Sequence, residues 1–329
     1  MLLENFHTSV VFKIDYFRLL NILQMKFSWK GVMPALTTQF NAQEAIDLHA
    51  FEHHVKAQMA AGVHGLILGG TLGEASTLEA EEKTTLVTTA LQLAEQRIPV
   101  IVNIAEQQTA TAVRLIEAAQ KNGVDGFMIL PPMRYKATSA ETVTYFKTLA
   151  AATDLPIMLY NNPVDYKIEI TLPMFEALAA CDNITAVKES TRDVSNVTRM
   201  RNHFGDRFQI MCGVDTIAME SLVMGADGWV AGLVDAFPEE TVAIYNYVQH
   251  GMYDKALAVH RWFFPLLELD IDPQLVQNIK QCEVATGLGT GYVRQPRVPN
   301  SGAVKAKVDA ILKASLAQRP DISDYKSLS

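Results

Sequence analysis

Residues 157–188, IMLYNNPVDYKIEITLPMFEALAACDNITAVK, contain the pattern of a complete β/α/β unit. An apolar run ends at Tyr160 before a turn-forming Asn-Asn-Pro, a helical pattern follows over residues 172–180, and a second β-rich run ends at Lys188. Two strands that are joined through a helix pair in parallel. The stretch therefore predicts a parallel sheet with helices on its face.

The same alternation repeats along the chain from Gly31 onward. Eight short β-rich runs alternate with helical stretches, and eight is the number of strands in a closed (β/α)8 TIM barrel. The runs are residues 32–38, 65–68, 100–104, 126–130, 157–160, 185–188, 209–212 and 229–233. A doubly wound open sheet is the alternative, but it usually carries a Gly-rich phosphate turn after its first strand, and Thr38 is followed by Gln-Phe-Asn-Ala-Gln-Glu. The pattern favours the α/β barrel.

The eight units leave a segment at each end of the chain. Residues 29–252 form the expected barrel, and residues 253–329 carry further amphipathic patterns that predict a C-terminal helical appendage. Residues 1–28 are expected to be an N-terminal extension without a catalytic role. Charged residues interrupt any signal-peptide core in this extension, and Met25 is an alternative start for the folded part.

The composition indicates a globular protein that acts on small molecules. The chain has 329 residues, of which 49% are hydrophobic, so it can bury a large core. A net charge of -8 argues against binding to nucleic acid or to an anionic membrane, since both attract a basic face. Every apolar run is shorter than the roughly 20 residues that span a bilayer. The three cysteines lack C-x-x-C spacing, which is typical of thiols in a reducing compartment and predicts neither a zinc site nor a disulfide framework. We therefore expect a cytoplasmic protein.

Polar residues at the ends of the predicted strands are the first candidates for an active site, because a TIM barrel places its site there. They are Thr37, Thr38, Thr71, Glu74, Asn103, Tyr160, Asn161, Lys188, Gly213 and Asp215. Lys188 follows Thr-Ala-Val in a buried strand, where an ammonium is costly unless it is paired or its pKa is lowered. A lysine with a lowered pKa can form an imine with a carbonyl carbon. A structural salt bridge to Glu74 is the alternative, and position alone does not decide between the two.

Two neighbouring features suit the same chemistry. The hydroxyl of Tyr160 is expected over the barrel mouth, where a phenol could transfer protons, although a tyrosine there can also simply support the rim. The turn at residues 69–74 contains three glycines, so its backbone amides can face an anion such as a carboxylate or a phosphate. A tight connection between strand and helix is the alternative role for that turn.

Three motifs together resemble those of the dihydrodipicolinate synthase and N-acetylneuraminate lyase superfamily, over residues 29–299. They are Gly70-Thr71-Leu72-Gly73-Glu74, Tyr160-Asn161-Asn162-Pro163 and Val187-Lys188-Glu189-Ser190. The resemblance implies that Lys188 forms a Schiff base with a 2-oxo acid substrate and that Tyr160 relays protons. It also implies that the Thr71 hydroxyl and nearby backbone amides, such as that of Gly70, receive the substrate carboxylate. A homotetramer or homodimer is implied, and no metal or organic cofactor, because the protonated imine is itself the electron sink.

Two positions depart from the pattern of the synthase. Leu72 stands where the synthase has a second Thr, whose hydroxyl extends the proton relay. Asp165 stands where the synthase has an Arg for the carboxylate of its aldehyde substrate, and an acid would repel that carboxylate. Tyr135 is a candidate for the aromatic residue that, in the synthase, crosses into the neighbouring subunit's site. With Gly70 and Gly213, these three residues complete the expected substrate contacts.

The departures favour the catabolic branch of the superfamily. The expected function is a Schiff-base lyase for a 2-oxo acid or cyclic imino acid, such as a 2-keto-3-deoxy sugar acid or 1-pyrroline-4-hydroxy-2-carboxylate. The alternative within the superfamily is 4-hydroxy-tetrahydrodipicolinate synthase, which condenses pyruvate with aspartate semialdehyde. Two other classes stay open: a barrel that binds a metal or phosphate through Glu74, Asp215 and Asn103, and a non-catalytic sensor of small acids.

Overall fold

The computed structural model describes residues 27–328 of the chain. The expected N-terminal extension therefore lies, up to residue 26, outside the described residues. None of the helices that the structure describes is long and apolar enough to cross a membrane.

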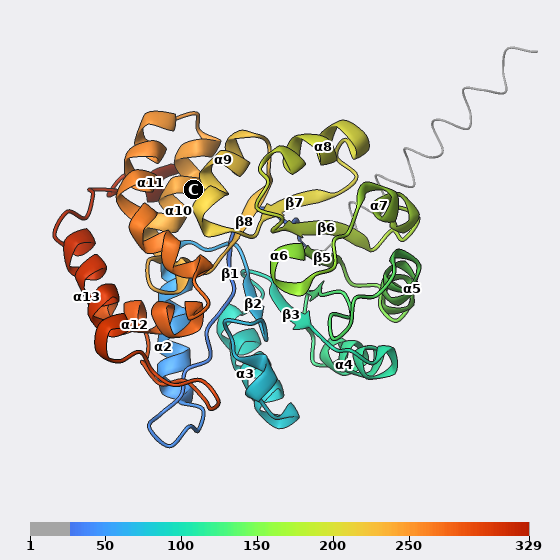
Figure 1. The fold of residues 1–329 in the computed structure, drawn as a ribbon, viewed down its shortest axis with the longest axis horizontal. Helices are drawn as coiled ribbons and strands as arrows, with labels where there is room; N and C mark the ends of the chain where they lie inside the picture. The colour runs from blue at the N-terminus through green and yellow to red at the C-terminus, as the bar shows by residue number, and fades with distance from the viewer. Residues whose placement is uncertain (1–26, 329) are drawn as a thin grey trace, which may run out of the picture.

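Eight parallel strands form one sheet that closes into a barrel, as the alternation of the sequence predicts (Figure 1). The strands are β1 (Gly31–Pro34), β2 (Leu66–Leu68), β3 (Val100–Ile104), β4 (Gly126–Ile129), β5 (Ile157–Asn161), β6 (Ile184–Glu189), β7 (Gln209–Cys212) and β8 (Gly228–Ala231). They pair in the order β1-β8-β7-β6-β5-β4-β3-β2. The gap between β1 and β2 is closed by a parallel bridge from Ala35 to Ile67, and the Leu36 amide donates to the Ile67 carbonyl at 2.9 Å. The (β/α)8 TIM barrel is confirmed.

Two strands end earlier than their apolar runs because buried carboxylates draw the backbone out of the sheet. Residues 32–38 were expected in the first strand, but β1 stops at Pro34, and the Thr37 amide donates to Asp235 at 3.4 Å. The last strand was expected over residues 229–233, but β8 stops at Ala231, and the Leu233 amide donates to Asp215 at 2.7 Å. Both carboxylates are buried, so these bonds replace sheet pairing that the backbone groups would otherwise need.

Helices connect successive strands around the outside of the barrel. They are α2 (Leu48–Ala61), α3 (Ala80–Ala94), α4 (Thr109–Lys121), α5 (Ser139–Ala150), α7 (Leu172–Leu178), α8 (Ser195–Phe204), α9 (Ala218–Val223) and α10 (Pro238–Gln249). A short helix, α6 (Pro163–Tyr166), and the 3-10 turns η1 (Ala75–Thr77), η2 (Asp215–Ile217) and η3 (Leu233–Asp235) follow strand ends. Sequence signals explain the helix ends: Asp47 accepts from the Ala50 amide at 3.0 Å and caps α2, and Gly62 ends it with φ 91°.

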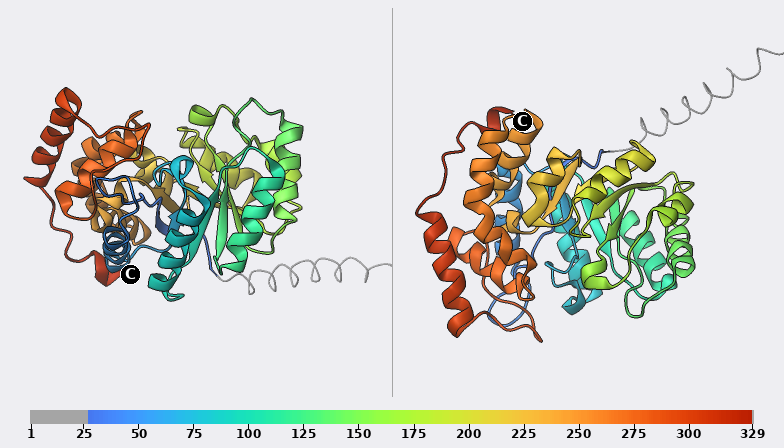
Figure 2. Two further views of the ribbon diagram at one scale, coloured as in Figure 1. Left: turned by 90° about the horizontal axis from the view of Figure 1, so that it is seen from below. Right: turned by 45° about the horizontal axis from the view of Figure 1, so that its top comes forward.

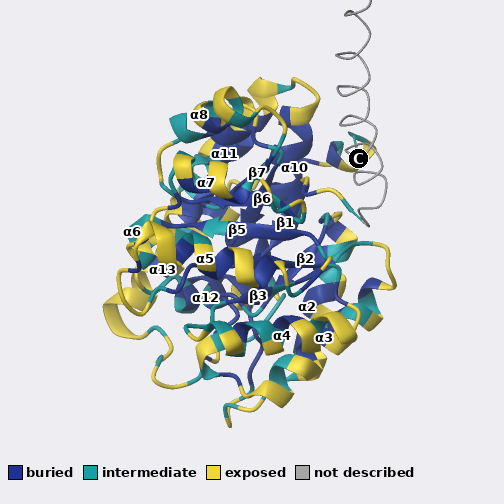
Figure 3. Cartoon of the chain, turned by 90° about the vertical axis from the view of Figure 1, so that its right-hand side faces the viewer, coloured by how far each residue is buried: buried dark blue, intermediate teal, exposed yellow. Residues whose placement is uncertain are grey.

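Further helices follow the eighth unit and pack on one side of the barrel, next to α2 and α10 (Figure 2). They are α11 (Tyr253–Leu267), the 3-10 turn η4 (Glu268–Ile271), α12 (Leu275–Thr286), α13 (Gly302–Leu316) and the 3-10 turn η5 (Tyr325–Leu328). Because α10 lies between the barrel and α11, nearly all of its side chains are buried, whereas other outer helices show one exposed face (Figure 3). We call α11 to η5 the C-terminal helices.

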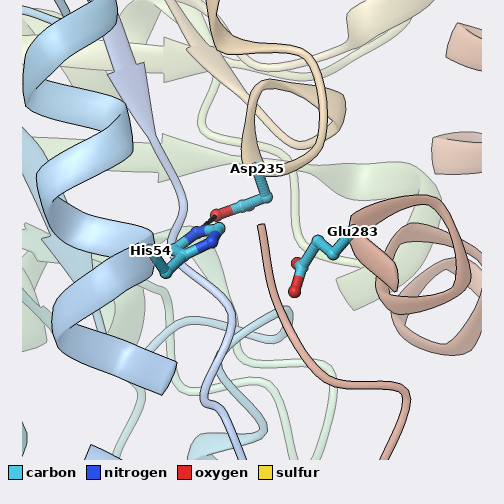
Figure 4. A group of neighbouring side chains, drawn as sticks. All are labelled: His54, Asp235 and Glu283. Atoms are coloured by element: carbon cyan, nitrogen blue, oxygen red, sulfur yellow. Dashed lines mark hydrogen bonds and ion pairs between the residues drawn. The ribbon is translucent and has the colours of Figure 1, made fainter. Parts of the chain in front are cut away.

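A buried ionic cluster joins these helices to the barrel (Figure 4). His54 of α2 contacts Asp235 of η3 at 2.7 Å, and its other ring nitrogen lies 3.1 Å from the Leu288 carbonyl. Glu283 of α12 completes the group. Burial alone would lower the pKa of His54, but the hydrogen bond with Asp235 and the charge of Glu283 raise it to about 9. Both ring nitrogens already have partners, so this cluster is a structural ion pair.

Candidate active site

A cavity of about 910 Å³ opens at the carboxyl ends of the strands. Its lining includes the turn after β2, the ends of β3, β5 and β6, the segments after β7 and β8, and residues of the C-terminal helices. It extends outward between α3 and α4, where Val87 and Leu115 line it. Lys188, Tyr160, Thr71, Gly70, Leu72, Asp165 and Gly213 all line this one cavity. The structure thus brings together every catalytic and substrate contact that the resemblance implied except Tyr135. The strand-end candidates Thr37, Thr38, Glu74, Asn161 and Asp215 do not line the cavity.

Lys188 lies on β6 and is only 7% exposed. It is the direct neighbour of Tyr160 on β5, and its Nζ lies 4.2 Å from the centre of the Tyr160 ring. Burial lowers the pKa of the amine, and the nearby Tyr166, Asp270 and Asp215 oppose this shift only in part. A neutral amine is the nucleophilic form of lysine, so its surroundings favour reaction with a carbonyl.

Glu74 does not hold Lys188, so the salt bridge considered from the sequence is wrong. The Glu74 carboxylate pairs instead with Lys280 of α12 at 2.7 Å, and both side chains are fully buried. It also accepts from the Arg294 amide at 3.0 Å. Among residues 27–328, Lys188 forms no ion pair within 4 Å, which leaves its amine available.

The Lys188 side chain lies in the space that a side chain at Gly213 would fill. A β-carbon at this position would come within 2.6 Å of both Cγ and Cε of Lys188 and within 2.2 Å of the Ser190 hydroxyl. The residue after β7 must therefore be glycine for Lys188 to keep its present path to the cavity.

The segment after β5 is organised by Asn162. Its amide nitrogen donates to the Tyr160 hydroxyl at 3.1 Å and to the Asp165 carboxylate at 2.7 Å, while its oxygen accepts from the Asp165 amide at the start of α6. Burial raises the pKa of Tyr160 to about 12, so its phenol keeps its proton at neutral pH. A protonated phenol beside a neutral amine can serve as a proton donor during imine formation.

Tyr166 was not a candidate from the sequence, yet it reaches the turn after β2. Its hydroxyl lies 2.8 Å from the Thr71 hydroxyl, and its ring meets that of Tyr160 edge to face, with 5.5 Å between centres. Leu72, which replaces the second Thr of the synthase, lines the cavity but has no hydroxyl. The hydroxyl that Thr71 contacts is that of Tyr166. The only sequence signal for Tyr166 is that it follows Asp165.

Two side chains fix the backbone of the turn between β2 and α3. Asn103 of β3 donates to the Gly69 carbonyl at 2.9 Å, and the Thr38 hydroxyl donates to the Gly73 carbonyl at 2.7 Å. A β-carbon at Gly70 would meet no atom within 4 Å, so this residue faces open space. The turn can therefore receive a carboxylate at its backbone amides and at the Thr71 hydroxyl.

Arg192 and Asp165 lie together at the cavity mouth. The Arg192 guanidinium is 3.9 Å from the Asp165 carboxylate, and both side chains are more than one-third exposed. Such a pair contributes little stability in water, so either partner is free to bind a ligand. Arg192 comes after β6, and the sequence patterns did not single it out.

Tyr135 does not reach this cavity. Its side chain is 56% exposed, and the neighbouring Met133 and Arg134 line the cavity in its place. The ring therefore lies outside the cavity of its own chain. Its crossing into a second subunit stays a prediction.

The chain matches the model of the dihydrodipicolinate synthetase family over residues 28–315. The chain belongs to this family. The 4-hydroxy-tetrahydrodipicolinate synthase of Exiguobacterium sibiricum is 34% identical over 278 residues, which cover 84% of this chain and 94% of that protein. The corresponding synthase of Ruegeria pomeroyi is 32% identical over 286 residues, which cover 87% of this chain and 98% of that protein. The solved structure of the synthase from Methylacidiphilum fumariolicum SolV superposes with a TM-score of 0.85 at 25% identity, covering 92% of this chain and 99% of that one.

Membership of the dihydrodipicolinate synthetase family makes the chain an enzyme, a lyase of the class I aldolase type. It does not support the sensor, since the relatives are named as synthases. The proposed metal or phosphate ligands are also engaged elsewhere: Glu74 binds Lys280, Asn103 binds the turn, and Asp215 accepts from Trp229 at 2.9 Å and from two backbone amides.

Proposed function

We propose that Lys188 forms a Schiff base with a 2-oxo acid and that the enzyme makes or breaks a carbon–carbon bond next to the resulting imine. The observation that carries the proposal is the buried Lys188, which has no ion pair among residues 27–328 and stacks on the partly buried Tyr160 at the mouth of the barrel. The amine nitrogen attacks the keto carbon, and the hydroxyl of the carbinolamine leaves as water after it takes a proton from Tyr160. The imine that remains is protonated and draws electrons from the adjacent carbon.

The turn after β2 positions the 2-oxo acid for this attack. Its carboxylate binds the backbone amides near Gly70 and the Thr71 hydroxyl, which Tyr166 supports from the other side. Tyr160, which is a phenolate after it has given its proton to the departing water, removes a proton from the carbon next to the imine. The resulting enamine attacks an aldehyde. Cleavage of an aldol follows the same steps in reverse.

For the second substrate, the named relatives support the condensation of pyruvate with aspartate semialdehyde better than they support a catabolic reaction. Arg192 supplies a guanidinium beside Asp165, the position at which the synthase pattern has an arginine. A cation there could bind the carboxylate of the aldehyde, although it comes from the segment after β6 rather than from the one after β5.

The second candidate is cleavage or dehydration of a 2-keto-3-deoxy sugar acid, or deamination of a cyclic imino acid. Asp165 favours it, because a carboxylate at the cavity mouth repels a second acidic group and accepts hydrogen bonds from sugar hydroxyls. Leu72 favours it as well, since this side chain cannot take part in the proton relay of the synthase.

Borohydride reduction in the presence of pyruvate tests the Schiff base. Peptide mapping is expected to find the adduct on Lys188 and not on Lys280, which is also buried but is paired with Glu74. Activity that persists while Lys188 stays unmodified would refute the mechanism. A substrate panel then separates the two candidates: pyruvate with aspartate semialdehyde, 2-keto-3-deoxygluconate, and 1-pyrroline-4-hydroxy-2-carboxylate.

A further inference from the structure

The cavity contains a carboxyl group, that of Asp270, which takes no part in imine formation at Lys188 or in proton transfer by Tyr160. It belongs to η4, in the C-terminal helices, and it lines the same cavity as Lys188. Among the carboxylates of residues 27–328, Asp270 is the one whose charge acts most strongly on the Lys188 amine. Among the described residues it forms no hydrogen bond or ion pair. A carboxyl group so placed is available to a ligand.

The fold makes room for this side chain. A β-carbon at Gly232, directly after β8, would come within 2.2 Å of Oδ1 and 3.0 Å of Cγ of Asp270. The Gly232 backbone cannot easily retreat, because its amide donates to the buried Asp215 at 3.1 Å. Only a glycine at the end of β8 therefore lets the Asp270 carboxyl lie against the barrel mouth.

The turn that carries Asp270 is fixed on both sides. Leu269 is buried, and its carbonyl accepts from Asn278 of α12 at 3.5 Å. Asp272 accepts from the Gln274 amide at 2.8 Å before α12 begins. The turn η4 also packs against η2, which follows β7. Asp270 is thus held at the site rather than presented on a loose loop.

The other carboxylates around the site already have partners. Asp165 binds Asn162 and Arg192, Asp215 binds Trp229 and backbone amides, and Asp235 binds His54. Each of these carboxylates is therefore already held by at least one hydrogen bond, whereas Asp270 has none among residues 27–328.

We propose that Asp270 is the catalytic residue that exchanges a proton with the aldehyde or hydroxyl oxygen one carbon beyond the enamine. The proposal rests on the proposed function. In condensation, the enamine carbon bonds to the aldehyde carbon, the carbonyl electron pair moves onto oxygen, and that oxygen takes the proton of the Asp270 carboxyl. In cleavage, the Asp270 carboxylate removes the same proton while the carbon–carbon bond breaks toward the imine. Solvent restores the protonation state of Asp270.

Burial and the neighbouring carboxylates favour the protonated form of the Asp270 carboxyl. Burial raises the pKa of the carboxyl well above its ordinary value, and the charge of Asp215 raises it further, while the Lys188 ammonium opposes the rise. Asp235 and Asp165 also raise it. When the Lys188 nitrogen is neutral, as in the free amine or the enamine, no positive charge on it opposes this rise, so the carboxyl holds the proton that it donates to the aldehyde oxygen.

The test separates formation of the enamine from the carbon–carbon bond step. Exchange of the methyl protons of pyruvate in D2O, followed by NMR, needs the imine and the enamine but no second substrate. Turnover is measured with pyruvate plus aspartate semialdehyde, pyruvate plus glyceraldehyde, and 2-keto-3-deoxygluconate. In Asp270→Asn, we expect exchange within about twofold of wild type and turnover lowered at least about 100-fold, as for loss of a general acid.

Two further variants sharpen the result. Gly232→Ala places a methyl group where the carboxyl lies, so it is expected to lower turnover and spare exchange in the same way. Glu268→Gln removes an exposed carboxylate from the same turn and should change neither rate.

Several outcomes would overturn the role of Asp270. They are an equal fall of exchange and turnover in Asp270→Asn, unchanged turnover in that variant, or a wild type that exchanges pyruvate protons but turns over none of the three substrates. A wild type that shows neither exchange nor a borohydride adduct would instead refute the Schiff-base function itself.

Discussion

Replacement of Gly213 by alanine tests whether the path of Lys188 decides the reaction. The new methyl group would lie 2.6 Å from Cγ and Cε of Lys188, whereas ordinary contacts begin at 3.4 Å, so the lysine chain must shift by about 1 Å. A displacement of this size in a reacting group costs about 100-fold in rate, which corresponds to about 2.7 kcal/mol in the barrier. Overpacking of the buried strand end should also cost about 1–3 kcal/mol of stability.

The assay is the rate of pyruvate proton exchange, with the free energy of unfolding measured in urea alongside it. Gly291→Ala is the control, because a methyl group there meets its nearest neighbour, Val284, at an ordinary 3.4 Å and should change neither quantity. Exchange in Gly213→Ala within twofold of wild type would refute the argument that this glycine positions Lys188. Slow exchange with a normal borohydride adduct would place the defect after imine formation, which also contradicts it.

Three other changes follow from contacts described above. Lys280→Met leaves the buried Glu74 carboxylate without its cation and should lower the free energy of unfolding in urea by about 3–5 kcal/mol. The double variant Lys280→Met with Glu74→Gln should recover part of this loss, and equal stability of the single and double variants would contradict a buried pair. The folded-state pKa of His54 is raised to about 9 and that of its partner Asp235 to about 7, so the stability that protonated His54 contributes is lost as the pH rises from about 7 through 9. Unfolding free energies measured over this range should show the fall, and His54→Gln should flatten it. Tyr166→Phe removes one hydrogen bond to Thr71 and should lower kcat about 2- to 10-fold without changing the melting temperature; an unchanged kcat would show that Thr71 does not need the Tyr166 hydroxyl to bind the substrate.

The sequence was sufficient for the barrel and for the position of its reactive lysine. Strand count and alternation depend on local pattern, and parallel strands necessarily bring their carboxyl ends together, so Lys188 and Tyr160 could be placed at one mouth. The charge partner of Glu74 could not be predicted in this way. Lys280 comes from a helix outside the eight units, and no local pattern connects it with the turn after β2.

Side chains that enter the cavity from loops and from the C-terminal helices were missed for the same reason. Asp270 lies in a short turn between two helices, and its approach to Gly232 depends on how those helices pack on the barrel. Arg192 depends on a left-handed backbone with φ 65°, which is rare for arginine and has no sequence signal. Tyr135 is exposed outside the cavity of its own chain, and its contact with a second subunit stays a prediction.

The pairing of Glu74 with Lys280 also bears on how the protein is made. The two residues are 206 positions apart, so when the ribosome has completed all eight strands the carboxylate beneath the β2 turn still lacks its cation. A nascent barrel at that stage would have to keep Glu74 hydrated or protonated, and its turn could not settle into its final shape. Early termination before α12 should therefore leave a chain with the whole sheet but an unfinished catalytic turn, a product that protein quality control can recognise by its incomplete packing.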